Sequence, residues 1–159
     1  MHYDTELAAM QSIAPQLMEK TARTGRETCA LVVRGKKGWR ALRPMSGLHN
    51  NVILPAVLMA VVSLFTREAA LLHTHPYCNC HNGEEFSGHR DEKGRIASMG
   101  DVCVPCMGRI RRIWLASPKG VLSHWDGRGE VRIAAVLPVP SDRIRFSSKC
   151  NGMLPKKPL

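Results

Sequence analysis

The chain has 159 residues, 44% of them hydrophobic, so it is long enough for one domain with a sizeable core and short for two. Its net charge of +10 is uneven: residues 1–106 hold 12 basic and 10 acidic side chains, whereas residues 107–159 hold 11 basic and 3 acidic. The longest apolar run, residues 52–65, is interrupted by Pro55 and Ser63 and is too short for a membrane span, which needs about 20 residues.

The N-terminal region predicts a helix followed by a hairpin. In residues 5–21, apolar side chains recur at three- and four-residue spacing, as one buried helix face requires, and Gly25 ends this helix. Residues 28–33 indicate a buried strand and residues 39–42 its returning partner. Glu27 stands at the start of this hairpin. The first 20 residues carry no apolar segment behind a basic start, so we expect an intracellular location or delivery by a signal-independent route.

The rest of the chain predicts a second helix and four strands. A loop over residues 44–51 leads to a helix over residues 55–67, because proline is tolerated in a first turn. Residues 69–75 indicate a strand, and the polar stretch 77–97 indicates a long loop. Turn sequences separate three final strands, which are predicted at 109–116, 120–125 and 131–136. We expect one domain over residues 1–146 with an insertion at 77–97, and a flexible basic tail over residues 147–159.

Two histidines lie at the end of the strand over residues 69–75. His73 and His75 are two residues apart, so they project from the same face and can offer two imidazole nitrogens to one metal ion. Ser98 follows 23 residues after His75, and Asp101 three residues later can add a carboxylate ligand. Three protein ligands leave a fourth position for water, as catalytic zinc requires. Glu27 is a candidate general base.

In their order along the chain, these residues resemble the signature of the JAB/JAMM (MPN-plus) zinc metallopeptidases. The signature is a Glu on an early strand, then His-x-His-Pro, then Ser-x-x-Asp, and it is matched here by Glu27, by 73–76 and by 98–101. The resemblance extends over roughly residues 5–138 and is closest to the JAB-like domains of bacterial polymorphic toxins and secretion-system effectors. It implies an α+β fold with a mixed, mostly antiparallel sheet flanked by helices, of the JAB1/MPN-like, cytidine-deaminase-like architecture.

The resemblance also implies roles for these residues. His73, His75 and Asp101 would bind Zn²⁺, Glu27 would take a proton from the attacking water, and Ser98 would hydrogen-bond the developing oxyanion. The reaction would be hydrolysis of a peptide or isopeptide bond, with a protein substrate such as a ubiquitin-like tail. An effector of this kind would have a delivery partner or an immunity partner.

Alternatives remain at two of these positions. The usual gap between the two parts of the signature is short, whereas residues 77–97 intervene here, and Asp91 inside this insertion is an alternative third ligand. Ser-x-x-Asp is also a helix-start pattern, so Ser98 and Asp101 can be a capping box. Glu6 and Glu19 are weaker candidates than Glu27 for the base.

Cysteines indicate a second metal site near the first. Thiolates two or three residues apart can hold one zinc ion tetrahedrally, and a structural Zn²⁺ would fasten the insertion. The candidate ligands are Cys78, Cys80, His81, Cys103 and Cys106. Independent thiols or a disulfide would explain the same pattern. Cys29 is expected to be a buried strand residue, Cys150 a thiol of the tail, and Trp39, Trp114 and Trp125 core or sheet-face residues.

Two other functions fit parts of the sequence. A nucleic-acid-binding module would use the basic C-terminal third to contact phosphates, with the cysteines and histidines as a structural site. A JAB-like domain that binds without cleaving would need only the loss of the base. Neither alternative explains the ordered signature together with a candidate base, so the zinc-dependent hydrolase is the preferred interpretation.

Overall fold

The computed structural model describes residues 1–46, 62, 64, 66–76, 86, 89–90, 96–98, 101–106 and 109–139. The elements in this part of the chain are α1 (Glu6–Thr24), β1 (Thr28–Gly35), β2 (Gly38–Ala41), β3 (Met45–Ser46), β4 (Glu68–Thr74), β5 (His89–Arg90), β6 (Ile96–Ser98), the 3-10 helix η1 (Asp101–Cys106), β7 (Ile110–Ala116), β8 (Val121–Trp125) and β9 (Arg132–Val136).

Helix α1 begins and ends at the residues whose chemistry favours helix ends. The side chain of Thr5 accepts a hydrogen bond from the backbone N–H of Ala8 at 3.1 Å, which satisfies one of the free donors of the first turn. Gly25 is in the left-handed conformation (φ 62°) and donates its N–H to Thr21 O at 2.8 Å. The predicted first helix is therefore confirmed.

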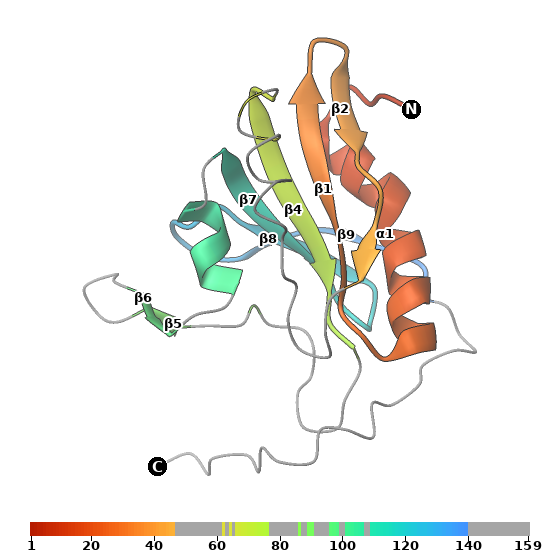
Figure 1. Cartoon of the computed structure of the whole chain (residues 1–159). Coiled ribbons are helices and arrows are strands. Elements are labelled where there is room, and N and C mark those ends of the chain that lie inside the picture. The colour runs from red at the N-terminus through yellow and green to blue at the C-terminus, as the bar shows by residue number, and fades with distance from the viewer. Residues whose placement is uncertain are drawn as a thin grey trace.

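The main sheet has the strand order β2-β1-β4-β7-β8-β9, with β3 pairing with β1 as well. Its pairs are antiparallel except for β4 and β7, which run parallel (Figure 1). The long chain segment between β4 and β7 makes this possible, because a parallel pair needs a crossover connection. The expected α+β class with a mixed, mostly antiparallel sheet is confirmed.

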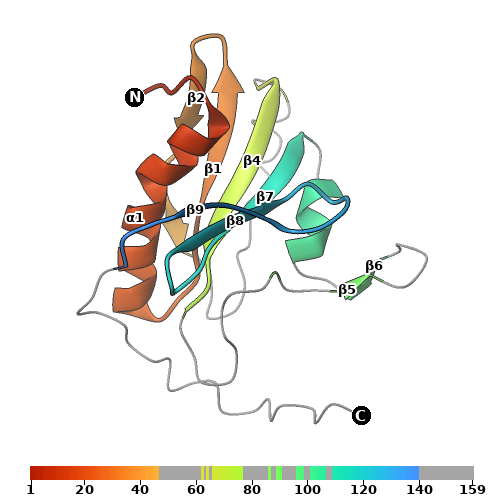
Figure 2. The same cartoon turned by 180° about the vertical axis from the view of Figure 1, so that it is seen from behind.

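Each face of the sheet carries its own apolar cluster. Helix α1 lies over one face along β1 (Figure 2), and its apolar stripe packs there against alternate residues of the strands. That cluster contains Ala9, Met10, Ala14, Leu17, Met18, Ala30, Val32, Trp39, Ala70, Leu72, Trp114, Ala116, Leu122 and Leu137. The opposite face buries Cys29, Leu31, Val33, Val62, Ala69, Leu71, Val104, Ile110, Ile113 and Trp125. The three tryptophans and Cys29 are buried, as predicted.

Two segments differ from the predictions. Residues expected in the loop 77–97 form strands β5 and β6, which pair as a separate ribbon beyond η1 (Figure 1). Within the loop expected at 44–51, Met45 and Ser46 pair with β1 as β3. In both cases backbone hydrogen bonds to a partner strand, which is β1 for β3 and a nearby segment for β5 and β6, extend residues that have no strand periodicity of their own.

Other expectations lie mostly outside the described residues. Of the helix predicted over residues 55–67, Val62 and Leu64 are described, and both are helical. The tail over residues 147–159 and Cys150 are not described, so the domain boundaries stay predictions. No helix in the described part of the chain combines the length and apolarity that a membrane crossing requires.

Candidate metal centre

His73 is held rigidly in the middle of the sheet. Its strand, β4, pairs with β1 on one side and with β7 on the other, and the His73 residue is only 1% exposed. Its Nδ1 lies 2.8 Å from the backbone oxygen of Trp114 on β7. Because a carbonyl oxygen can only accept, Nδ1 carries the hydrogen and donates it, which leaves Nε2 with a free lone pair in the neutral ring.

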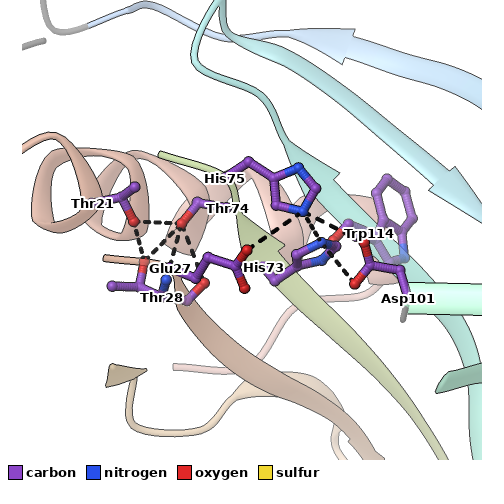
Figure 3. A network of polar contacts seen from close by, with 8 residues as sticks. All are labelled: Thr21, Glu27, Thr28, His73, Thr74, His75, Asp101 and Trp114. Carbon is purple, nitrogen blue, oxygen red and sulfur yellow. Dashed lines mark hydrogen bonds and ion pairs between the residues drawn. The ribbon is translucent and has the colours of Figure 1, made fainter. Parts of the chain in front are cut away.

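Three side chains converge at the end of β4 (Figure 3). His75 follows the last residue of the strand, and its Nε2 lies 3.1 Å from Nε2 of His73. Asp101 is the first residue of η1, and its Oδ1 lies 3.2 Å from His73 Nε2 while its Oδ2 lies 3.5 Å from His75 Nε2. Within the described residues, these three side chains form the group that could hold a metal ion, with ligand atoms all within 4.8 Å of one another.

The spacing of the three groups suits a zinc ion. Two ligand atoms bound to one tetrahedral zinc at 2.0–2.1 Å lie about 3.3 Å apart. The two Nε2 atoms are 3.1 Å apart, and each lies 3.2 or 3.5 Å from its nearer Asp101 oxygen, so these separations bracket this value. Two imidazoles and one carboxylate are also a usual donor set for catalytic zinc. The residues therefore fit the metal that the sequence predicts.

Helix η1 places Asp101 because Val104 of the same helix is anchored in the core. Val104, one helical turn along, is 8% exposed and packs in the apolar cluster opposite α1. Burial alone would raise the pKa of the Asp101 carboxyl, but the charges and hydrogen bonds of His73 and His75 outweigh it and hold this pKa well below its usual range. Asp101 is thus an ionised carboxylate at neutral pH.

Glu27 lies on the other side of His75, immediately before β1. Its Oε1 is 3.9 Å from His75 Nε2, and its side chain is 13% exposed (Figure 3). Burial raises the pKa of Glu27 from 4.5 to about 7; the nearby charge of His75 opposes this increase and the Asp101 carboxylate adds to it. A carboxyl with a pKa near neutrality can both accept and release a proton at physiological pH.

Several predicted site residues are described only in part or not at all. Ser98 ends β6 and pairs with His89, and its side chain is not described. Residues 99 and 100, between Ser98 and η1, lie outside the described part of the chain, so the capping-box alternative for Ser98 and Asp101 stays a prediction. Cys103 and Cys106 lie in η1 without described side chains. Outside the described residues are Asp91, Cys78, Cys80 and His81. The second zinc site stays a prediction.

Glu6, one of the weaker candidates for the base, instead makes contacts that join two elements of the fold. Its carboxylate, at the first residue of α1, is buried and accepts hydrogen bonds from the Arg112 guanidinium at 2.6 to 3.1 Å and from the Trp114 indole N–H at 2.6 Å. These bonds tie the start of α1 to β7. Glu19 is exposed on α1.

Sequence patterns did not identify four residues near the centre. The Trp114 carbonyl that orients His73 belongs to the main chain, and since every residue has such a group, the residue types in the sequence give no sign of it. The ring of Phe86, whose centroid is 6.0 Å from that of His73, comes from the insertion. Thr28 and Thr74 are buried polar residues at the ends of apolar strands, and that contrast is a signal which could have identified them.

Comparison with known proteins adds no relative: no family model, no curated protein and no solved structure matches the chain.

Proposed function

We propose that this protein is a zinc-dependent hydrolase that cleaves peptide or isopeptide bonds, with a site of the JAMM type. One observation carries the proposal: the Nε2 atoms of His73 and His75 are 3.1 Å apart, and the two Asp101 carboxylate oxygens lie 3.2 Å from the first and 3.5 Å from the second, with the Glu27 carboxylate 3.9 Å from His75 Nε2. The order of these residues along the chain, Glu, His-x-His-Pro and Ser-x-x-Asp, supports the same family.

Each residue of the proposed site has a separate role. When bound, zinc supplies a Lewis acid that polarises a carbonyl oxygen and lowers the pKa of water to about 7. Asp101 contributes negative charge to the ligand set, and His73 keeps its ring fixed by donating Nδ1–H to Trp114 O. Glu27 takes a proton at its carboxylate and returns it to the leaving amine, a role for which a pKa of about 7 is suited. Ser98 is proposed as the donor to the developing oxyanion.

The class of substrate follows from the resemblance. A JAMM-type centre points to an amide bond in a protein, such as a ubiquitin-like tail or another peptide, and the substrate would be met inside a cell. A role as a secreted effector with a delivery or immunity partner is part of the same proposal. So is a second, structural zinc on the cysteines.

Zinc content per chain tests the metal proposal first. We expect wild type to hold one zinc at the His73 and His75 site, plus a second if the cysteines bind one, and the His73→Ala/His75→Ala variant to hold one fewer. Glu27→Gln should keep this zinc while hydrolysis of ubiquitin-like and peptide substrates falls by roughly 10²- to 10⁴-fold. If the double variant loses no metal, the hydrolase proposal is wrong, and steeply salt-dependent binding to random DNA would then favour the nucleic-acid alternative.

A further inference from the structure

Three buried threonine hydroxyls meet directly behind the metal centre. Thr21 on α1, Thr28 at the start of β1 and Thr74 at the end of β4 are 4%, 0% and 1% exposed. The Thr74 hydroxyl lies 2.9 Å from that of Thr28 and within hydrogen-bonding distance of that of Thr21, and the Thr21 and Thr28 hydroxyls are 2.8 Å apart (Figure 3). We call these three residues the threonine cluster.

Every hydroxyl hydrogen in the cluster has an acceptor. Thr28 O–H donates to the backbone oxygen of Leu17 at 3.0 Å, and Thr74 O–H donates to the backbone oxygen of Thr28 at 3.3 Å. Thr21 O–H then donates to either neighbouring hydroxyl, and Thr74 Oγ1 also accepts the backbone N–H of Thr28 at 3.2 Å. A fully satisfied buried network of this kind favours one arrangement of the three segments, because any displacement leaves a buried polar group unpaired.

Two residues of the threonine cluster are direct neighbours, along the chain, of the proposed site residues. Thr74 is the residue between His73 and His75, and Thr28 directly follows Glu27. The two threonines are opposite one another in the β1–β4 register. Their side chains face α1, while His73 faces the opposite side of the sheet, since successive residues of a strand alternate. The threonines therefore lie on the α1 face of the sheet, opposite the face that carries His73.

We propose that Thr74, through the threonine cluster, is a positioning residue that sets the placement of His75 and Glu27 relative to His73. His75 and Glu27 lie just outside the paired strands, so the sheet ladder alone does not hold them. The Thr74 hydroxyl makes hydrogen bonds to the main chain of Thr28 and to the Thr21 side chain in the last turns of α1. These bonds fix the two strand ends from which His75 and Glu27 project. This inference rests on the proposed function, which gives the placement of His75 and Glu27 its purpose. The hydrogen bonds of the threonine cluster themselves involve no metal ion.

Thr74→Val tests the inference, because valine keeps the β-branched shape and removes the hydroxyl. We expect zinc affinity, measured by competition with a chelating dye, to fall roughly 10- to 100-fold, as is usual when a group that orients metal ligands is lost. The visible spectrum of the Co²⁺-substituted protein should shift as well. Thr74→Ser, which keeps the hydroxyl, should restore both. A Thr74→Val protein with wild-type zinc affinity and an unchanged Co²⁺ spectrum would overturn the inference.

Controls separate positioning from general stability. Ser117 is as buried as Thr74 and accepts the Val121 N–H in the turn between β7 and β8, so Ser117→Ala should lower stability without changing zinc affinity. If Thr74→Val does not fold, Thr21→Val removes one hydroxyl from the helix side only and is measured in its place. Equal losses of zinc affinity in Ser117→Ala would contradict a positioning role.

One readout needs no metal. The ¹H–¹⁵N signals of the His73 and His75 rings in metal-free protein report their tautomers and surroundings. Thr74→Val should move the His75 signals while the His73 Nδ1–H bond to Trp114 O persists. If wild type binds no zinc, the proposed function fails, and these signals still decide whether Thr74 positions the ring. Unchanged ring signals in Thr74→Val would reject the inference whether or not zinc binds.

Discussion

Glu27→Gln should stabilise the metal-free protein at alkaline pH, although it lowers hydrolysis by roughly 10²- to 10⁴-fold. Burial raises the pKa of Glu27 from 4.5 in the unfolded chain to about 7 in the fold. Because its pKa is raised, the folded state holds the Glu27 proton more tightly than the unfolded chain does. The stability that the protonated carboxyl contributes is therefore complete below pH 4.5 and is lost as pH rises through 7. Ionising the buried carboxyl then costs on the order of 3 kcal/mol at pH 8, and less than about 1 kcal/mol at pH 5.

Glutamine does not ionise, so the variant avoids this cost. The free energy of unfolding, measured by urea denaturation in the presence of a metal chelator, should favour Glu27→Gln over wild type by up to about 3 kcal/mol at pH 8, with the difference shrinking toward pH 5. Glu130→Gln is the matched control, because Glu130 is exposed between β8 and β9. A difference between Glu27→Gln and wild type that is the same at both pH values would refute the reasoning.

Three further predictions concern the described residues. Glu6→Gln should lower the free energy of unfolding by roughly 2 kcal/mol, because it weakens charge-assisted bonds to Arg112, as urea denaturation will measure. The thiol of Cys29, whose pKa burial raises to about 12 with a smaller contribution from Glu27, should resist iodoacetamide at pH 8 until the protein unfolds, as mass spectrometry of the labelled peptide will show. Asp101→Asn should lose one zinc per chain in elemental analysis, whereas Asp91→Asn should not.

Each of these predictions has an outcome that contradicts it. A loss of stability in Glu130→Gln as large as in Glu6→Gln would mean that the buried contacts of Glu6 are not its cause. Rapid labelling of Cys29 in the native protein would show that its strand is not buried. Zinc retained in Asp101→Asn but lost in Asp91→Asn would make Asp91 the third ligand.

Local patterns in the sequence determined most of the secondary structure. The three- and four-residue spacing of apolar side chains, with Thr5 and Gly25 at its ends, predicts α1 because helix capping and amphipathicity are local properties. Apolar segments between turn residues predict β1, β4 and the final strands for the same reason. The pairing of His73 with His75 at a strand end was also visible, since two-residue spacing places both on one face.

Only the tertiary structure decided how these elements meet. The parallel pairing of β4 with β7 brings the Trp114 carbonyl to His73, and the packing of η1 brings Asp101 to both histidines. Such contacts join residues far apart in the chain, and no periodicity encodes which strand pairs with which. Thr74 gains its partners in the same way, from a helix and a strand that precede it by more than 40 residues. The sequence thus determined which side chains could form a centre, and the fold decided their distances, their burial and the raised pKa of Glu27.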